Sequence, residues 1–101
     1  MMYTFEKDFI ILGYRENDYT NNKGEKVEQY IINIAYIYDK YTGLHVSQAY
    51  ITKDKLGDIN LSELLENYLF KATCSYNKKL KRLYIEKINS YEERMWFKCG
   101  F

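Results

Sequence analysis

The sequence predicts an all-β fold with one short helix, and three observations support this prediction. First, the chain has 101 residues, which is the size of one domain. Second, 47% of its residues are hydrophobic, and it contains 12 Tyr and 5 Phe but no Pro, a composition that excludes intrinsic disorder. Third, apolar side chains mostly alternate along the chain between clusters of Gly, Asn and Asp, as they do in strands joined by turns.

Three strands are predicted in the first half of the chain. Tyr3–Glu16 carries apolar side chains on both faces, and Gly13 would permit a bulge near its end. A polar hairpin loop, Asn17–Lys26, leads to Val27–Asp39, whose Ile- and Tyr-rich faces indicate a central strand. Leu44–Lys53 also alternates, and we expect it to pair antiparallel with the strand before it.

A helix is predicted after the third strand, because the apolar spacing changes there. The helical positions i, i+3, i+4, i+7 and i+8 are occupied by Leu61, Leu64, Leu65, Tyr68 and Leu69. Asn60 and Glu63 resemble a capping box that begins this helix.

The last part of the chain predicts a second hairpin and a short helix. Strands Phe70–Asn77 and Leu80–Asn89 flank a tight basic turn, and a second capping pattern predicts a helix over Tyr91–Lys98. The order β-β-β-α-β-β is that of the OB-fold, a five-stranded Greek-key barrel. We therefore expect residues 1–90 to form an OB-like barrel. Residues 91–101 would form an aromatic tail that packs on the barrel or on a partner subunit, within a single domain.

The sequence offers no motif for catalysis, metal binding or cofactor binding. It lacks a P-loop, a dinucleotide fingerprint and a nucleophile elbow, so we expect neither an enzyme nor a bound cofactor. Cys74 and Cys99 have no metal-ligand spacing, and His45 is the one histidine. Signal-peptide features and long apolar runs are absent, which predicts a soluble, cytoplasmic protein with no membrane contact.

The charge is unevenly distributed along the chain. With 15 Lys+Arg and 14 Asp+Glu the net charge is +1. Up to Glu66 there are 7 basic and 11 acidic residues, a balance of −4, and after it there are 8 basic and 3 acidic residues, a balance of +5. Four of the five residues Lys78–Arg82 are cations, whose mutual repulsion a phosphate would relieve.

A protein that binds single-stranded nucleic acid without sequence preference needs aromatic rings for base stacking and a basic groove for phosphates. Tyr30 alternates with Ile32 and Ile34, and Tyr68 lies on the apolar face of the predicted helix, so both are assigned to the core. Tyr19, Tyr41 and Tyr50 have polar neighbours and are the candidates for base stacking. The predicted nucleic-acid-binding residues are Arg15, Tyr19, Lys23, Lys26, Tyr38, Lys40, Tyr41, Tyr50, Lys53, Tyr76, Lys78, Lys79, Lys81, Arg82 and Tyr84.

Part of the chain resembles a known family. The run GYRENDYTNNKGEKVEQYIINIAYIYD, followed by TGLHVSQAYI and a basic hairpin, resembles the small OB-fold single-stranded DNA-binding proteins of bacteriophages, including the filamentous-phage helix-destabilising type. The resemblance spans Phe9 to Ile88 and implies a homodimer that coats single-stranded DNA during replication. It implies a DNA-gripping set formed by Arg15, Tyr19, Lys23, Lys26 and Tyr30, with Tyr41 at the next turn. This chain departs from the family in its helix, its aromatic tail and four acids near the first hairpin, Glu16, Asp18, Glu25 and Glu28.

The function predicted from these features is the coating of single-stranded DNA in phage or mobile-element replication, through stacked tyrosines and a basic hairpin. The same chemistry also suits RNA. The alternative function is a protein–protein interaction module, in which surface tyrosines and the residues Met95, Trp96 and Phe97 form the contact.

Overall fold

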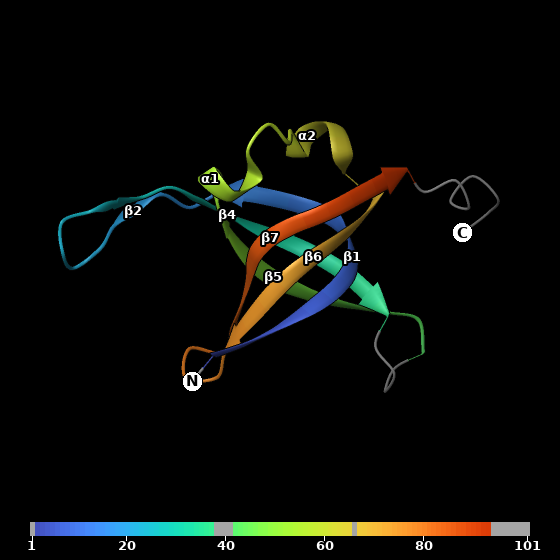
Figure 1. Ribbon diagram of the computed structural model, residues 1–101, viewed down its shortest axis with the longest axis horizontal. Helices are drawn as coiled ribbons and strands as arrows, with labels where there is room; N and C mark the ends of the chain where they lie inside the picture. The colour runs from blue at the N-terminus through green and yellow to red at the C-terminus, as the bar shows by residue number, and fades with distance from the viewer. Residues whose placement is uncertain (1, 38–41, 66, 94–101) are drawn as a thin grey trace.

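The computed structural model describes residues 2–37, 42–65 and 67–93, and most of them lie in β-strands (Figure 1). The strands are β1 (Met2–Glu16), β2 (Tyr19–Thr20), β3 (Lys26–Val27), β4 (Gln29–Ile37), β5 (Leu44–Thr52), β6 (Tyr68–Asn77) and β7 (Arg82–Glu93). Two single-turn helices, α1 (Lys53–Leu56) and α2 (Leu61–Leu64), lie between β5 and β6. The prediction of a β-rich chain with five principal strands and a helical segment after the third is confirmed.

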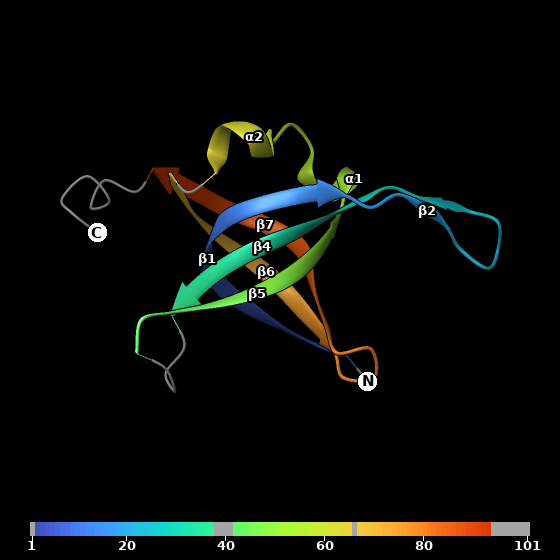
Figure 2. The ribbon, with the colours of Figure 1, turned by 180° about the vertical axis from the view of Figure 1, so that it is seen from behind.

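The five long strands form one sheet that closes on itself as a barrel. The order of neighbours is β1-β4-β5-β7-β6, and β6 pairs back with β1. β5 and β7 run parallel, while the other neighbours are antiparallel. Figures 1 and 2 show the barrel from opposite sides, with the β2–β3 hairpin extending beyond it and the helical segment lying across one end.

β1 pairs with two neighbouring strands and contains a bulge. Residues 2–9 of β1 pair with β6, and residues 10–16 pair with β4. The register with β4 shifts between Ile11 and Gly13, which confirms the bulge predicted at the glycine. A bulge increases the local twist of a strand, so it helps β1 to bend from one side of the barrel to the other.

The core consists of apolar side chains at alternate, inward-facing positions of the five strands. Phe9 and Phe70 stack at its centre with ring centroids 5.8 Å apart, and Ile34 is fully buried. Burying each such side chain stabilises the fold by about 1.5–3 kcal/mol. Leu56 and Leu61 are also buried, so the two helical turns close one end of the core.

The predicted helix over Leu61–Leu69 is correct at its start and wrong in its length. The Asn60 side chain accepts a hydrogen bond from the Ser62 backbone nitrogen at 3.1 Å, as expected of an N-cap. The helix ends at Leu64, and Tyr68 and Leu69 instead pair with Glu93 and Glu92 in the β6–β7 ladder. The cross-strand ladder outweighs the local helical spacing, because it joins the new strand to the closed sheet.

The structure also corrects the prediction for the end of the chain. Residues 91–93 continue β7, so the helix predicted over Tyr91–Lys98 is wrong at its start; residues 94–98 lie outside the described residues. Among the described residues, no helix is long and apolar enough to span a bilayer.

Candidate nucleic-acid interface

Tyr50, Arg82 and Tyr84 form a cluster, here called the Tyr50 cluster, on the outer surface of the barrel. Tyr50 and Tyr84 occupy facing positions where β5 and β7 run parallel, and their ring centroids are 5.6 Å apart. The Arg82 guanidinium carbon lies 5.0 Å from the Tyr50 ring centroid. Side chains alternate between the two faces of a strand, so the buried neighbours Ala49 and Leu83 face inward while these three face outward.

Tyr19, in the β2–β3 hairpin, lies within electrostatic range of this cluster. Its side chain is 47% exposed and lies near enough to the guanidinium to contribute to the raised pKa of Arg82. The largest cause of that raised pKa is a side-chain hydrogen bond with Tyr84, followed by the electrostatic influence of Tyr50; desolvation opposes both. The permanent Arg82 cation therefore lies against the side chains of Tyr50 and Tyr84, and Tyr19 adds a weaker electrostatic influence from the hairpin.

The β6–β7 turn continues this surface with a group of exposed lysines. Lys78, Lys79 and Lys81 are all exposed, and none of them forms an ion pair with another described residue. The Asn77 side chain accepts a hydrogen bond from the Leu80 backbone nitrogen at 3.0 Å, and this bond shapes the turn. In Figures 1 and 2 the turn and the hairpin lie on the same side of the barrel.

Arg15 lies on the same transverse row of outward-facing residues as the two tyrosines. The register pairs Arg15 with Ile31, Ile31 with Tyr50, and Tyr50 with Tyr84, across four adjacent strands. Neighbouring strands are about 4.8 Å apart, so Arg15 and Tyr50 are separated by about 10 Å. Ile31 lies between them in this row and is only 6% exposed, so neighbouring side chains cover it.

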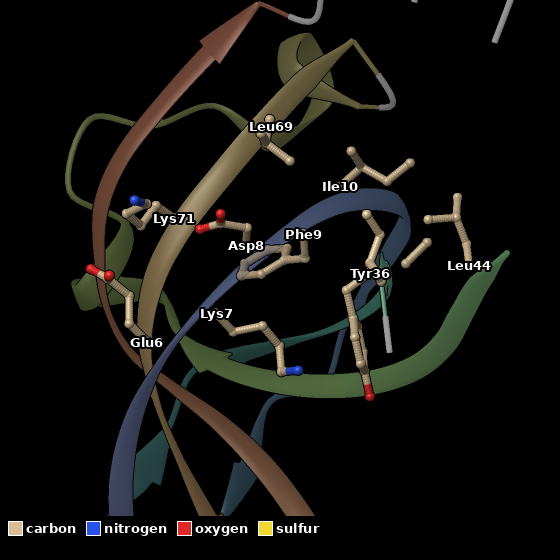
Figure 3. A pocket seen from close by; sticks show the side chains of 11 residues that line it. Glu6, Lys7, Asp8, Phe9, Ile10, Tyr36, Leu44, Leu69 and Lys71 are labelled. Carbon is tan, nitrogen blue, oxygen red and sulfur yellow. The ribbon is translucent and has the colours of Figure 1, made fainter. Parts of the chain in front are cut away.

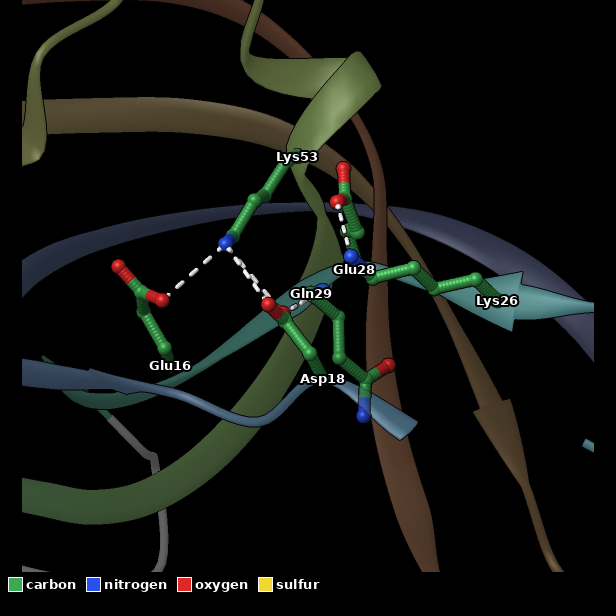
Figure 4. A network of polar contacts seen from close by, with 6 residues as sticks. All are labelled: Glu16, Asp18, Lys26, Glu28, Gln29 and Lys53. Carbon is green, nitrogen blue, oxygen red and sulfur yellow. Dashed lines mark hydrogen bonds and ion pairs between the residues drawn. The ribbon is translucent and has the colours of Figure 1, made fainter. Parts of the chain in front are cut away.

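Two of the predicted phosphate-binding lysines are held by carboxylates instead (Figure 4). The Lys53 ammonium lies 3.3 Å from both Glu16 and Asp18, and Lys26 lies 3.3 Å from Glu28. Desolvation lowers the pKa of Lys53, but its hydrogen bonds to Asp18 and Glu16 outweigh that effect and raise the pKa overall. The acids around the hairpin thus neutralise these cations.

The remaining predicted residues that the structure describes do not lie at the Tyr50 cluster. Tyr76 is half-buried and packs against the core at one end of the barrel, away from the outer face. Lys23 is exposed near the hairpin tip, where its backbone nitrogen donates to the Asn21 side chain at 2.9 Å. Tyr38, Lys40 and Tyr41 lie outside the described residues.

Sequence reasoning missed two amide side chains on the same outer face. Asn33 and Gln48 are paired across β4 and β5, both are exposed, and they lie one row from Ile31 and Tyr50. The signal was present in the alternation, because Gln48 is two residues from Tyr50 and Asn33 is two residues from Ile31. These amides can form hydrogen bonds with base edges.

The described residues contain no cluster of three or more His, Cys, Asp or Glu side chains that could hold a metal ion. Cys74 is fully buried, and desolvation raises the pKa of its thiol to about 11, so it is poorly suited to act as a nucleophile. No protein-family model matches this chain, and neither a curated protein nor a solved structure matches it.

Proposed function

We propose that this protein is an OB-fold protein that binds single-stranded DNA without strong sequence preference. Numbering only the five long strands, their order around the ring is 1-2-3-5-4, with a helical segment between the third and fourth. This arrangement supports an OB-fold. In OB-folds the face of the second and third strands, together with the loops after the first and fourth strands, binds oligonucleotides.

The Tyr50 cluster is the observation that carries the proposal. Tyr50 and Tyr84 offer adjacent rings on which bases can stack, at about 1–3 kcal/mol per base. Arg82 lies against Tyr50, where it can contact a phosphate or stack on a base. Tyr19 is exposed on the hairpin that follows the first strand, the loop that contributes to oligonucleotide binding in OB-folds.

The charges suggest a path for the phosphates. The turn contributes four cations, Lys78, Lys79, Lys81 and Arg82, whereas residues 15–28 carry three cations and four acids, a balance of −1. A polyanion is therefore attracted to the β6–β7 turn and weakly repelled by residues 15–28. In this proposal the backbone follows the turn while bases lie on the Tyr50 cluster toward Arg15. A role in phage or mobile-element replication rests on the sequence resemblance described above.

An exposed apolar surface favours a second candidate function, the binding of a protein or of a second copy of the chain. Ile37 is 81% exposed, Val46 58%, Leu44 41% and Leu12 38%, and the strands that carry them are neighbours. Such surfaces often mark protein interfaces. If DNA binding requires a homodimer, this is the face on which we would expect the second protomer.

A titration with a 20-nucleotide oligo-dT, repeated at several salt concentrations, tests the proposal. We expect binding that weakens steeply as the salt concentration rises. Changing Lys79, Lys81 and Arg82 to Ala should reduce the slope of log K against log salt by roughly 2. The matched control changes Lys71 and Lys87 to Ala, since both are exposed but lie further along β6 and β7. Absence of binding at low salt, or equal losses in both variants, would contradict the proposal.

A further inference from the structure

One end of the barrel holds an aromatic hollow that is separate from the Tyr50 cluster. Its volume is about 340 Å³, within the range of about 300–1,000 Å³ typical of small-molecule sites. Its walls include Tyr3, Phe5, Tyr36, His45 and Tyr76, arranged around Lys7. We call it the barrel-end hollow. All five long strands contribute to its lining, so the closed sheet fixes its shape.

Lys7 occupies a position that the core pattern would assign to an apolar residue. Phe5, Lys7, Phe9 and Ile11 alternate along one face of β1, and the other three pack in or against the core. The Lys7 ammonium lies 3.5 Å from the Tyr36 ring centroid and 5.8 Å from that of Phe5. Partial burial lowers the pKa of Lys7, and the nearby Cys74 opposes this effect. A cation held among rings loses part of its hydration, and the attraction of a bound anion would compensate for that loss.

Among the residues that the structure describes, no carboxylate lines the barrel-end hollow and Lys7 forms no ion pair. A second hollow of about 500 Å³ shares Lys7 and Tyr36 with the barrel-end hollow and is also lined by Glu6 and Asp8 (Figure 3). Glu6 and Lys7 point to opposite sides of β1. The two carboxylates therefore disfavour an anion in the second hollow, while Lys7 favours one in the barrel-end hollow.

We propose that the barrel-end hollow binds a nucleoside monophosphate unit, with the phosphate on the Lys7 ammonium and the base against the rings of Tyr3 and Phe5. The single cation matches one phosphate, and charge-assisted hydrogen bonds to phosphate are stronger than neutral ones. The Tyr3 and Phe5 centroids are 5.7 Å apart, so together they form a wall wide enough for a base. The Ser47 hydroxyl also lines the hollow, and its oxygen can accept a hydrogen bond from the polar edge of the base.

The test is calorimetric titration of the whole chain with dTMP, thymidine and inorganic phosphate. We expect dTMP to bind more tightly than either of the other two, and Lys7→Met to weaken dTMP binding about tenfold or more, with recovery in Lys7→Arg. The control is Lys87→Met, because Lys87 is exposed and lines neither hollow. Binding of 5′-hydroxyl oligo-dT at the Tyr50 cluster should be unchanged in Lys7→Met. Failure of this inference, which rests on the proposed function only for the class of ligand, is therefore distinguishable from failure of the proposed function.

A second variant protects the test against misfolding of the Lys7 substitutions. Tyr3 is 53% exposed at the rim, so Tyr3→Leu should fold normally and weaken dTMP binding, whereas Tyr3→Phe should retain it. Equal binding of dTMP by the wild-type protein and by Lys7→Met would overturn the inference, and so would equal binding of thymidine and dTMP. A 5′-phosphorylated oligo-dT that binds more tightly than its 5′-hydroxyl form, dependent on Lys7, identifies the ligand as a strand end. Equal binding of the two oligomers, with dTMP binding retained, identifies it as a free nucleotide.

Discussion

The rings of Tyr50 on β5 and Tyr84 on β7 lie 5.6 Å apart although 34 residues separate them along the chain. The parallel pairing of these two strands brings them together and places Arg82 against the same ring of Tyr50. No other described pair of long strands runs parallel, so this aromatic and cationic surface depends on the way the barrel closes.

Tyr50→Leu should weaken binding of oligo-dT, because it removes a stacking ring and retains an apolar side chain. We expect a loss of about 1–3 kcal/mol, or roughly 5- to 150-fold in Kd, measured by fluorescence anisotropy at fixed salt. Tyr50→Phe should bind nearly as well as the wild-type protein. Tyr91, 45% exposed at the other end of β7, supplies a control: an equal loss in Tyr91→Leu would mean that the Tyr50 cluster is not the platform.

Lys53→Ala should leave the salt dependence of DNA binding almost unchanged. The Lys53 ammonium lies between Glu16 and Asp18, so this group of three residues has a net charge of −1 and attracts no phosphate. Lys81→Ala, in contrast, should reduce the slope of log K against log salt by about 0.7. The two slopes are measured in parallel titrations. A similar reduction in both variants would mean that Lys53 contacts phosphate, contrary to this prediction.

Stability should decrease in acid partly through Glu86. Hydrogen bonds from Lys55, at 2.8 Å, and from Ser75 lower the pKa of Glu86 in the folded state. The stabilisation is therefore fully present above the pKa that Glu86 has in the unfolded chain. It is lost as the pH falls through the lower pKa that Glu86 has in the folded protein. Glu86→Gln should cost less than about 1 kcal/mol at pH 7, because the pair is partly exposed. Urea unfolding at pH 7 and pH 3 measures this; a difference from wild type that persists at pH 3 would contradict the assignment.

Two isoleucines on β4 should respond very differently to truncation. Ile34 is fully buried, and Ile34→Ala should lower the free energy of unfolding by about 2–5 kcal/mol. Ile37 is 81% exposed, and Ile37→Ala should change it by no more than about 0.5 kcal/mol. Denaturant unfolding of both variants compares them directly. A large loss in Ile37→Ala would show that the exposed apolar surface is covered in solution, as a dimer would require.

Cys74 should be unreactive toward a thiol reagent such as DTNB until the protein unfolds. The side chain is fully buried and its pKa is raised to about 11, so the thiolate is both scarce and inaccessible. The measurement uses Cys99→Ser, which leaves Cys74 as the single thiol. Rapid labelling of this variant in native buffer would show that the barrel opens at β6.

The strand pattern could be predicted because alternation is a local property. Ile32 and Ile34 point to the core simply because they are two residues apart in an extended run. The helix end could not be predicted in this way, because Tyr68 and Leu69 satisfy helical spacing locally and join β6 only through their partners on β7. Long-range pairing decides such a segment, since a strand gains its hydrogen bonds from residues distant in the sequence.

The types of residue in the candidate site could be predicted from the sequence, but which of the predicted residues lie together could be predicted less well. Tyr50, Arg82 and Tyr84 are predicted from the sequence as binding residues, and in the structure they lie together. Lys53 was also selected, but its partners Glu16 and Asp18 lie more than thirty residues earlier in the chain, so its neutralisation could not be seen from local composition.

The sequence by itself determined the number and approximate limits of the long strands, the N-cap at Asn60, the bulge at Gly13 and the concentration of cations in the last third of the chain. These features depend on neighbours within a few residues. Tertiary structure alone decided which tyrosines face outward together, which of the described lysines form ion pairs with acids distant in the sequence, and that Lys7 lies among rings at the barrel end. Closure of the sheet sets these contacts, because it juxtaposes side chains whose separation along the chain carries no signal of their distance in space.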